Sequence, residues 1–500
     1  MKSSKLLMRI LCLLMALCTV CAVLASCAAE DDTDTDASEN VAEASGEGDT
    51  SEEVLTDEEG YLLLESIPEN FQIGGEFTVL GWGDGMQHYR EEQSDDVVGN
   101  AIYKRNVTVE DRLGVDLQWS FSPGNWDYKH EYIQKVKSTS DAGMAYDALV
   151  CYNLVPYALA VQGLAENLYD TAYIDLTAPW WPSAYLGEAL YNETIFGLVE
   201  GYAYATMRQM TGVFFNNDLI ENKGLKSPYD MVAANEWTLD GMMTMLKGTY
   251  EDRNSNGKKD ENDFYGASTG YSPQVDGWFY GAGYRWSDFD GEGNLILLAG
   301  DSSIIEFTNR MAEAFSQQDF YGVDAVRGTL FKESRAILYM ESVTLADTTL
   351  KDQEIRYGIV PAPKRDASQE RYYTHLTNRH DAWCIPLNAK DNDNSSAVIE
   401  CMAYESYRHV DPVYYESCIK LRYASDERLG EMYDLMRESI TFDFFYLFGA
   451  SFSKFPIEPM RFCCQMPDQY SWASIWQQYS NSWTAEFNNI VDLYGGSVKK

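Results

Sequence analysis

Basic side chains are scarce in this sequence of 500 residues. Its 38 Lys and Arg stand against 78 Asp and Glu, so that the formal net charge is -40. Because proteins contact nucleic-acid phosphates mainly through Lys and Arg, this deficit argues against a nucleic-acid partner. The hydrophobic content of 45% and the chain length are sufficient for two or three folded domains with sizeable cores.

Common catalytic motifs are also missing. The sequence has no H-E-x-x-H, no Walker A motif and no complete G-x-G-x-x-G, and its five histidines have no recognisable partner motif. Gly266 to Gly270 matches G-x-S-x-G, but a nucleophile elbow needs a helix directly after the serine, and Tyr271-Ser272-Pro273 is a poor helix start. We therefore expect a protein that is not an enzyme and has no catalytic cofactor. A surface glycoside hydrolase or esterase is the alternative, because a catalytic carboxylate pair cannot be picked out among 78 acids.

A single long hydrophobic run, Ile10 to Leu24, follows a basic N-terminus. Its length fits the h-region of a signal peptide and is short for a membrane span. The run ends in Leu24-Ala25-Ser26-Cys27, which resembles the lipobox of bacterial lipoproteins. The resemblance implies that residues 1–26 are a signal peptide and that Cys27 carries a diacylglyceryl membrane anchor. An ordinary secretory signal with a chance cysteine is the alternative.

The next segment, residues 27–60, contains 14 acidic and no basic side chains, and almost no large apolar ones. Such a segment cannot bury enough apolar surface to fold. We expect it to be a disordered tether that holds the folded body away from the membrane.

Strand and helix patterns alternate after this tether. Strand patterns cover 76–80, 115–119 and 146–152, and helix patterns lie between them at 98–113 and 130–137. This order predicts an α/β fold with a mostly parallel sheet flanked by helices. In such sheets ligands bind beyond the carboxyl ends of the strands, which points to Trp82, Asp84, Tyr152 and Asn153.

Four segments carry a family resemblance: EFTVLGWG at 76–83, GVFFNNDLIENKGL at 212–225, Glu236-Trp237-Thr238, and YGIVPAPK at 357–364. In this order they resemble the family 1 extracellular solute-binding lipoproteins of bacterial ABC importers. The resemblance implies a type II periplasmic-binding-protein-like fold, in which two α/β lobes are joined by a hinge and hold the ligand in the cleft between them. It also implies a carbohydrate ligand and an ABC transporter permease as partner. The lipobox and acidic tether belong to the Gram-positive form, on the extracellular face of the membrane.

The expected lobe boundaries follow from this resemblance. We expect lobe 1 to be formed by residues 61–210 and by a return segment at 366–430, and lobe 2 by residues 211–365. Residues 431–500 are expected to be a helical segment that packs on lobe 2. Within it, Trp472, Trp476, Tyr479, Trp483, Phe487 and Ile490 recur at helical spacing, which is typical of a packed helix face.

A sugar presents apolar C–H faces and a rim of hydroxyls, so its site needs flat aromatic rings and a few directed polar groups. The sequence contains 12 Trp and 35 Tyr, and several Trp lie in polar, Gly-rich loops. Polar candidates come from predicted strand ends and lobe crossings. The predicted ligand-binding residues are Trp82, Asp84, Tyr152, Asn153, Trp181, Arg208, Trp278, Trp286, Glu341, Arg379 and Asp381.

The most complete local motif is a predicted calcium-binding loop. Oxygen ligands recur at the spacing of an EF-hand loop, with Gly257 at the sharp turn and Asp rather than Glu at the last position. The predicted ligands are Asp252, Asn254, Asn256, Lys258 through its carbonyl, Asp260 and Asp263. Calcium would have a structural role in lobe 2. The alternative is a metal-free polar turn held by Asx hydrogen bonds.

Together these observations predict an extracellular, lipid-anchored and monomeric solute-binding protein. We expect it to capture a carbohydrate, in particular an oligosaccharide, and to deliver it to an ABC importer. A polysaccharide-adhesion lipoprotein without a transporter is a further alternative.

Overall fold

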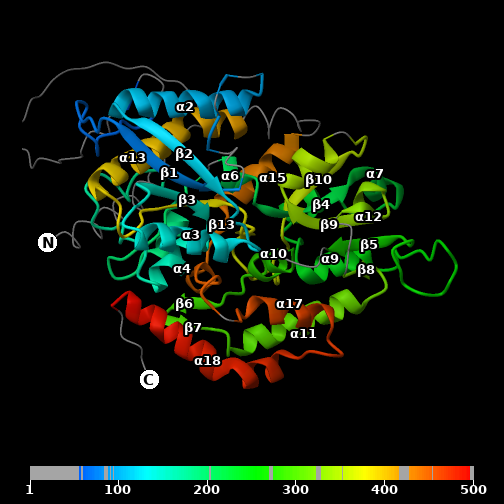
Figure 1. Cartoon of the computed structure of the whole chain (residues 1–500). Helices are drawn as coiled ribbons and strands as arrows, with labels where there is room; N and C mark the ends of the chain where they lie inside the picture. Colours follow the sequence, from blue (N-terminus) through cyan, green and yellow to red (C-terminus); the bar gives the residue numbers. More distant parts are fainter. Residues whose placement is uncertain are drawn as a thin grey trace, which may run out of the picture. The chain divides into compact units, whose positions relative to one another are not determined.

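The computed structural model describes residues 56–495 except 58–59, 84–87, 91, 94, 202–203, 270–273, 323–327, 352, 416–426 and 453. The predicted signal peptide, Cys27 and most of the predicted tether lie outside the described residues. Thr56 to Lys500 form one compact unit that contains two main β-sheets (Figure 1). In the described part of this unit, no helix combines the length and apolar character needed to cross a membrane.

The first sheet has four strands in the order β12-β3-β1-β2. They are β1 (Glu76–Trp82), β2 (Asp116–Ser122), β3 (Ala148–Tyr152) and β12 (Asp381–Cys384). β1 pairs in parallel with β2 and β3, which confirms the parallel sheet predicted from the alternating pattern, and β12 adds to β3 in the antiparallel direction. β3 is buried along its whole length, which explains its continuous apolar sequence.

The crossover helices of this sheet are α2 (Val97–Leu113) and α3 (Lys129–Asp141). α2 contacts β2 and lies beside α13 (Asn392–Glu405) from the later part of the chain (Figure 1). Gly114 ends α2 in the left-handed conformation, with φ of 60°, and its N–H bonds back to Glu110 O. The helix stop and the following strand therefore lie where the sequence pattern placed them.

The second sheet has five strands in the order β10-β4-β9-β5-β8. They are β4 (Thr211–Asn216), β5 (Tyr265–Thr269), β8 (Phe320–Tyr321), β9 (Ala336–Ser342) and β10 (Tyr357–Pro361). β5 is parallel to both neighbours, whereas β4 is antiparallel to both of its own. This sheet is therefore evenly mixed rather than mostly parallel. The difference arises at β4, the strand through which the chain enters the sheet, because it runs opposite to β9 and β10.

Two segments connect the sheets and bond to each other. The first precedes β4 and the second joins β10 to β12. Met210 and Leu376 form an antiparallel bridge, and Thr377 N donates to Gln209 O at 2.9 Å. Connections at element ends are where hinge motions between lobes are absorbed.

The remaining elements cover the sheets and build the C-terminal region. Their helices are α4 (Val155–Val161), α5 (Ser183–Ala189), α6 (Tyr204–Met207), α7 (Asn217–Asn222), α8 (Pro228–Ala233), α9 (Leu239–Leu246), α10 (Gln274–Gly281), α11 (Ser302–Ser316), α12 (Thr329–Lys332), α15 (Glu427–Glu438), α16 (Phe444–Leu447), α17 (Ile457–Gln465) and α18 (Trp472–Leu493), with π-helical turns η1 (Ala346–Leu350) and η2 (Ser406–Val410). Two small sheets pair β6 (Ser287–Phe289) with β7 (Leu295–Leu297), and β11 (Thr374–His375) with β13 (Ile440–Thr441).

The C-terminal helices pack on α11 of the second half of the chain. α17 and α18 both contact α11 (Figure 1). On α18 the predicted face turns inward: Trp472, Trp483, Phe487 and Ile490 are buried, and Trp476 is half-buried. A helix with one apolar stripe needs such a partner to stay folded.

The end of the predicted tether differs from the expectation. Asp57, counted among its disordered residues, accepts a hydrogen bond from Arg408 Nη2 at 2.5 Å, and both side chains are largely buried. Thr56 forms a bridge with Leu62. The folded body thus begins before residue 61, because a basic partner far along the chain neutralises an acid of the acidic run.

Candidate functional site

A cavity of about 400 Å³ lies beside the carboxyl end of β3. We call it the main cavity. Its wall is formed by Trp126, Asp127, Lys129 and His130 at the start of α3, residues 377–379 of the second crossing segment, and parts of 446–461 around α16 and α17, together with Tyr152 and Leu154. Its volume is within the range of small-molecule sites, and its position beyond a strand end is the position that α/β sheets commonly use.

Aromatic rings form part of the wall of the main cavity. Trp126 is 43% exposed, so its ring is accessible, whereas tryptophan side chains are on average largely buried. Lys129 Nζ lies 3.9 Å from the centre of that ring. Tyr152 contacts the cavity and meets Trp82 edge to face, with 5.4 Å between ring centres. An accessible ring beside polar groups is the surface that a sugar C–H face requires.

Charged and polar side chains complete the wall. They are Asp127, Lys129, His130, Thr377, Asn378, Arg379, Lys454, Glu458 and Arg461. Arg379 is exposed, whereas Lys129 is buried. Arg461 donates from Nε to Asp276 Oδ1 of α10 at 2.8 Å, and its Nη2 also bonds to Asp276 Oδ2. This ion pair joins the C-terminal wall to the second half of the chain.

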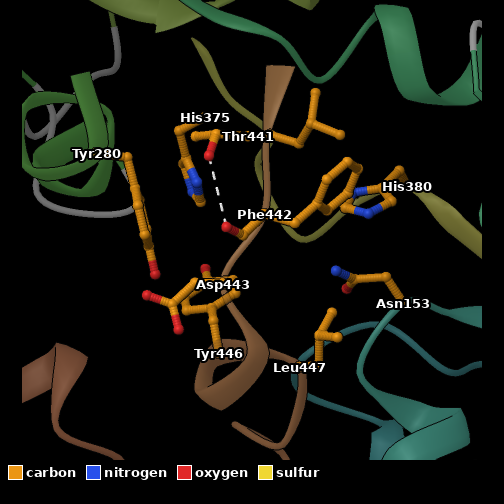
Figure 2. A pocket seen from close by; sticks show the side chains of 10 residues that line it. Asn153, Tyr280, His375, His380, Thr441, Phe442, Asp443, Tyr446 and Leu447 are labelled. Carbon is orange, nitrogen blue, oxygen red and sulfur yellow. Dashed lines mark hydrogen bonds between the residues drawn. The ribbon is translucent and has the colours of Figure 1, made fainter. Parts of the chain in front are cut away.

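A second cavity, of about 10 Å³, is enclosed between Asn153, Tyr280, His375, His380 and Tyr446 (Figure 2). Tyr280 and His375 stack with 4.6 Å between ring centres. Burial lowers the pKa of His375 well below its ordinary value and that of His380 to about 4. This volume is about that of one water molecule, so the small cavity cannot admit a sugar ring. Asn153, predicted to contact ligand, lines this small cavity instead of the main one.

Trp82 and Asp381 lie next to the main cavity and bond to each other. Trp82 Nε1 donates to Asp381 Oδ1, and His88 Nε2 lies 2.8 Å from Asp381 Oδ2. Both predicted residues therefore support Tyr152 from behind, through the edge contact with Trp82. The neighbouring candidate Asp84 lies outside the described residues.

Three predicted stacking residues lie in the core. Trp181 donates from Nε1 to Glu400 Oε2 at 2.9 Å, Trp278 donates from Nε1 to Thr269 Oγ1 at 3.3 Å, and Trp286 stacks on Phe279 with 4.9 Å between ring centres. All three rings are buried and none lines either cavity. Their placement differs from the prediction of sugar stacking. For Trp278 the reason is that Gly277 and Gly281 let α10 pack closely on Thr211, Met340 and Ala362, so the glycines serve packing and do not mark an open loop.

Arg208 and Glu341 also lie away from both cavities. Arg208 Nε is 3.3 Å from Asp347 Oδ2, and Glu341 Oε2 accepts from Gln274 Nε2 at 2.6 Å. These contacts give both side chains partners within the protein. Of the eleven predicted ligand-binding residues, Tyr152 and Arg379 line the main cavity.

Several residues of the main cavity were not predicted. Trp126 follows Pro123-Gly124-Asn125, which is the same polar, Gly-containing context that singled out Trp82. That signal was available in the sequence. Lys129, Tyr446 and Arg461 carry no such signal, because their place on the cavity wall depends on how the C-terminal segment packs.

The predicted calcium loop closes on itself through Asx hydrogen bonds. Asp252 accepts from Gly257 N at 2.9 Å, and Asp260 accepts from the amides of Asn254 and Asn256. A hydrogen bond from Asn262 N, together with these two amide bonds, lowers the pKa of Asp260 to about 2. Gly257 has φ of 68°, as the sharp turn requires. Asp263, at the last ligand position, is buried and accepts from Tyr250 Oη at 2.9 Å. Lys258 N bonds to Asn256 Oδ1 at 2.7 Å.

The loop's donor set is compatible with calcium, since five oxygen-bearing side chains share a short turn. No cluster of three or more His, Cys, Asp or Glu side chains with metal-binding geometry occurs among the described residues. Two of the predicted side-chain ligands are asparagines, and asparagine is not among the four residue types that define such a cluster.

The G-x-S-x-G segment does not form an elbow at its serine. Ser268 lies inside β5, pairs with strands on both sides and is completely buried. A nucleophile elbow instead exposes its serine on a sharp turn between strand and helix.

Comparisons with known proteins identify the fold. No protein-family model and no curated protein match the sequence. An extracellular solute-binding protein from Staphylococcus aureus, solved in complex with maltose, matches with a TM-score of 0.55 and 12% identity, covering 83% of this chain and 98% of that chain.

Two further solved structures agree with it. An ABC substrate-binding protein from Listeria monocytogenes, in complex with cycloalternan, has a TM-score of 0.52 and 13% identity over 85% of this chain and 100% of that one. UgpB from Mycobacterium tuberculosis, in complex with glycerophosphocholine, has a TM-score of 0.52 and 13% identity over 83% of this chain and 98% of that one. The chain therefore has the two-lobed α/β fold of the periplasmic-binding-protein-like solute-binding proteins.

Proposed function

We propose that this protein is an extracellular solute-binding protein that captures a carbohydrate in the main cavity and delivers it to an ABC importer. The observation that carries the proposal is the cavity itself. It is about 400 Å³ in volume, lies beyond the carboxyl end of β3, and combines the accessible ring of Trp126 with directed polar groups. Aromatic surface plus a few polar groups is the combination that binds sugars.

The proposed mechanism is closure of the two lobes around the ligand. The second crossing segment contributes Thr377, Asn378 and Arg379 to the cavity wall and bonds to the first crossing through Gln209. A ligand that contacts this wall would bind the closed arrangement more tightly and shift the population toward it. The closed form would then dock on the permease.

The experiment is thermal unfolding of residues 56–500 against a panel of neutral and acidic oligosaccharides. A ligand at 100 times its Kd adds about 2.7 kcal/mol to the free energy of unfolding and raises Tm measurably. We expect a selective shift with one sugar class and no change in the sugar itself by mass spectrometry. Turnover of the sugar would support the hydrolase alternative, and no shift with any member would contradict the proposal.

The lipobox-like sequence ending in Cys27 supports a lipid anchor on the extracellular face of the membrane, with residues 28–55 as the tether. Two acyl chains would hold the protein stably. Membrane fractionation of the native protein and of a Cys27→Ser variant tests this proposal. Release of the variant into the medium is the expected result.

Calcium binding by the loop at 252–263 is a separate proposal. It is supported by the EF-hand spacing of its oxygens and by the positive φ of Gly257. Isothermal titration with Ca²⁺ should give a one-to-one isotherm that Asp252→Asn removes. Identical thermal unfolding in Ca²⁺ and in chelator would contradict it.

A further inference from the structure

The main cavity is lined by an excess of positive charge in a protein of net charge -40. Its cations are Lys129, Arg379, Lys454 and Arg461, and its anions are Asp127 and Glu458. Arg461 is neutralised by Asp276 behind the wall. Without Arg461, the remaining cations of the cavity still outnumber its anions. In the whole chain, by contrast, acids outnumber bases about two to one.

The least exposed cation that has no carboxylate partner in this wall is Lys129. The residue is 8% exposed, and among the described residues its Nζ forms no ion pair: it contacts the Trp126 ring and backbone instead. Its one protein acceptor is Trp126 O, at 2.7 Å, which leaves two of its three N–H donors available. The two cavity acids, Asp127 and Glu458, are both exposed and therefore surrounded by water.

Burial of an ammonium group without a counter-ion costs free energy, and here it lowers the pKa of Lys129. Asp127 and Glu131 act in the opposite direction without forming an ion pair. An anion in the cavity would remove this cost. Arg379, an exposed residue of the second crossing segment that lines the same cavity, offers a planar set of donors for such an anion.

The start of α3 adds to this field. α3 begins at Lys129, and its N-cap residue, Tyr128, makes no side-chain capping bond. The positive end of the helix dipole thus lies beside the same wall, where it favours negative charge.

We propose that the ligand of the main cavity is a saccharide that carries an anionic group, a uronate carboxylate or a sulfate ester, held by Lys129 and Arg379 while a ring face lies on Trp126. This inference rests on the proposed function, since it names the class of sugar that the same cavity takes. Neutral oligosaccharides are expected to bind weakly.

The test is isothermal titration of the purified protein with a panel of matched pairs. The panel contains oligogalacturonate, oligomannuronate and unsulfated chondroitin disaccharide, each with its carboxyl-reduced neutral form, and sulfated disaccharides with their desulfated forms. We expect an acidic member to bind at least tenfold more tightly than its neutral form, and its affinity to fall as NaCl is raised. The sulfated and carboxylated arms distinguish the two sources of charge.

Three variants locate the contact. Lys129→Gln and Arg379→Gln should each weaken binding of the acidic ligand by about 10- to 100-fold, the effect of losing a charge-assisted hydrogen bond. Arg379 is exposed, so its variant should fold normally. Lys137→Gln is the matched control, because it removes one charge from the exposed face of the same helix, where Lys137 pairs with Asp141.

The outcomes separate the two proposals. Equal binding of acidic and neutral forms overturns the anionic ligand and leaves the solute-binding function in place. Selective acidic binding that neither cavity variant weakens overturns the assigned contacts. Absence of binding to every member of both sets overturns both proposals.

Discussion

Arg461 of α17 forms a two-point ion pair with Asp276 of α10, and the Asp276 side chain has no exposed surface. The two residues are separated by 185 positions in the sequence. The pair fixes a cationic side chain in the wall of the main cavity and connects the C-terminal segment to the second half of the chain. A contact of this kind links the stability of the protein to the shape of its candidate site.

Breaking this pair should destabilise the protein strongly. In Asp276→Asn the guanidinium of Arg461 keeps its charge but loses its buried partner, which costs about 3–5 kcal/mol. Unfolding by urea, followed by circular dichroism, measures the change. Arg356→Gln is the matched control, because Arg356 pairs with Asp218 and Glu221 on the surface, where water screens the charges. A similar loss in both variants would contradict the role given to the buried pair.

Removing the accessible ring of Trp126 should weaken ligand binding without unfolding the protein. Trp126→Ala is expected to raise Kd about tenfold, because the stacking surface and its contact with Lys129 are lost. Tyr128→Ala is the control: Tyr128 is 48% exposed in the same loop but does not line the cavity. Titration of both variants with the ligand identified by the panel decides the point. Unchanged affinity in Trp126→Ala would remove the ring from the site.

Acid should destabilise the protein through His380. Burial lowers the pKa of His380 from 6.5 to about 4. The hydrogen bond between its Nδ1 and Thr377 O, at 2.8 Å, acts in the opposite direction and raises the pKa. Between pH 4 and 6.5 the unfolded chain binds more protons than the folded protein. The free energy of unfolding therefore falls by about 3 kcal/mol as the pH is lowered from 6.5 toward 4. His380→Asn keeps a donor for Thr377 O and removes the titration. Urea unfolding at several pH values should show a flatter profile for the variant, and parallel profiles would contradict this.

Glu400 should act with the opposite sign. Burial raises its pKa from 4.5 to about 8, although hydrogen bonds from Trp181 and its neighbours act against this. The folded state therefore holds the proton more tightly, and stability present below pH 4.5 is lost as the pH rises toward 8, by at most about 5 kcal/mol. Glu400→Gln mimics the protonated acid. We expect near-equal stability of variant and parent at pH 5 and a more stable variant at pH 8.5, measured by the same unfolding assay. A variant that is less stable at the higher pH would show that the carboxylate is needed.

The first sheet, and the position of the candidate site at the carboxyl end of its strands, could be predicted from the sequence because both depend on local patterns. The runs that became β1, β2 and β3 are separated by helical spacing, and a parallel sheet with right-handed crossovers is the expected product. Tyr152 follows from the same rule, since it ends β3. Arg379 was identified through its place at a predicted crossing between lobes.

Which tryptophan rings are exposed and which are buried could not be predicted from local sequence patterns. Trp126 and Trp278 both lie near glycine in polar surroundings, yet the first is 43% exposed and the second 1%. The difference depends on which surface each ring meets after folding. Trp278 lies on α10, which packs against the second sheet, β11 and α17, whereas Trp126 precedes α3 at the edge of the main cavity.

The sequence by itself determined the acidic character, the alternation of strands and helices, the packed face of α18 and the order of segments that indicates the fold. Each of these depends on residues close together in the chain, so periodicity and composition are enough to specify it. Only the tertiary structure decided which rings stay accessible and which charges surround the cavity. Its wall combines residues from the start of α3, from 377–379 and from parts of 446–461. The burial of Lys129 and of the Arg461–Asp276 pair arises from packing between segments that are far apart in the sequence.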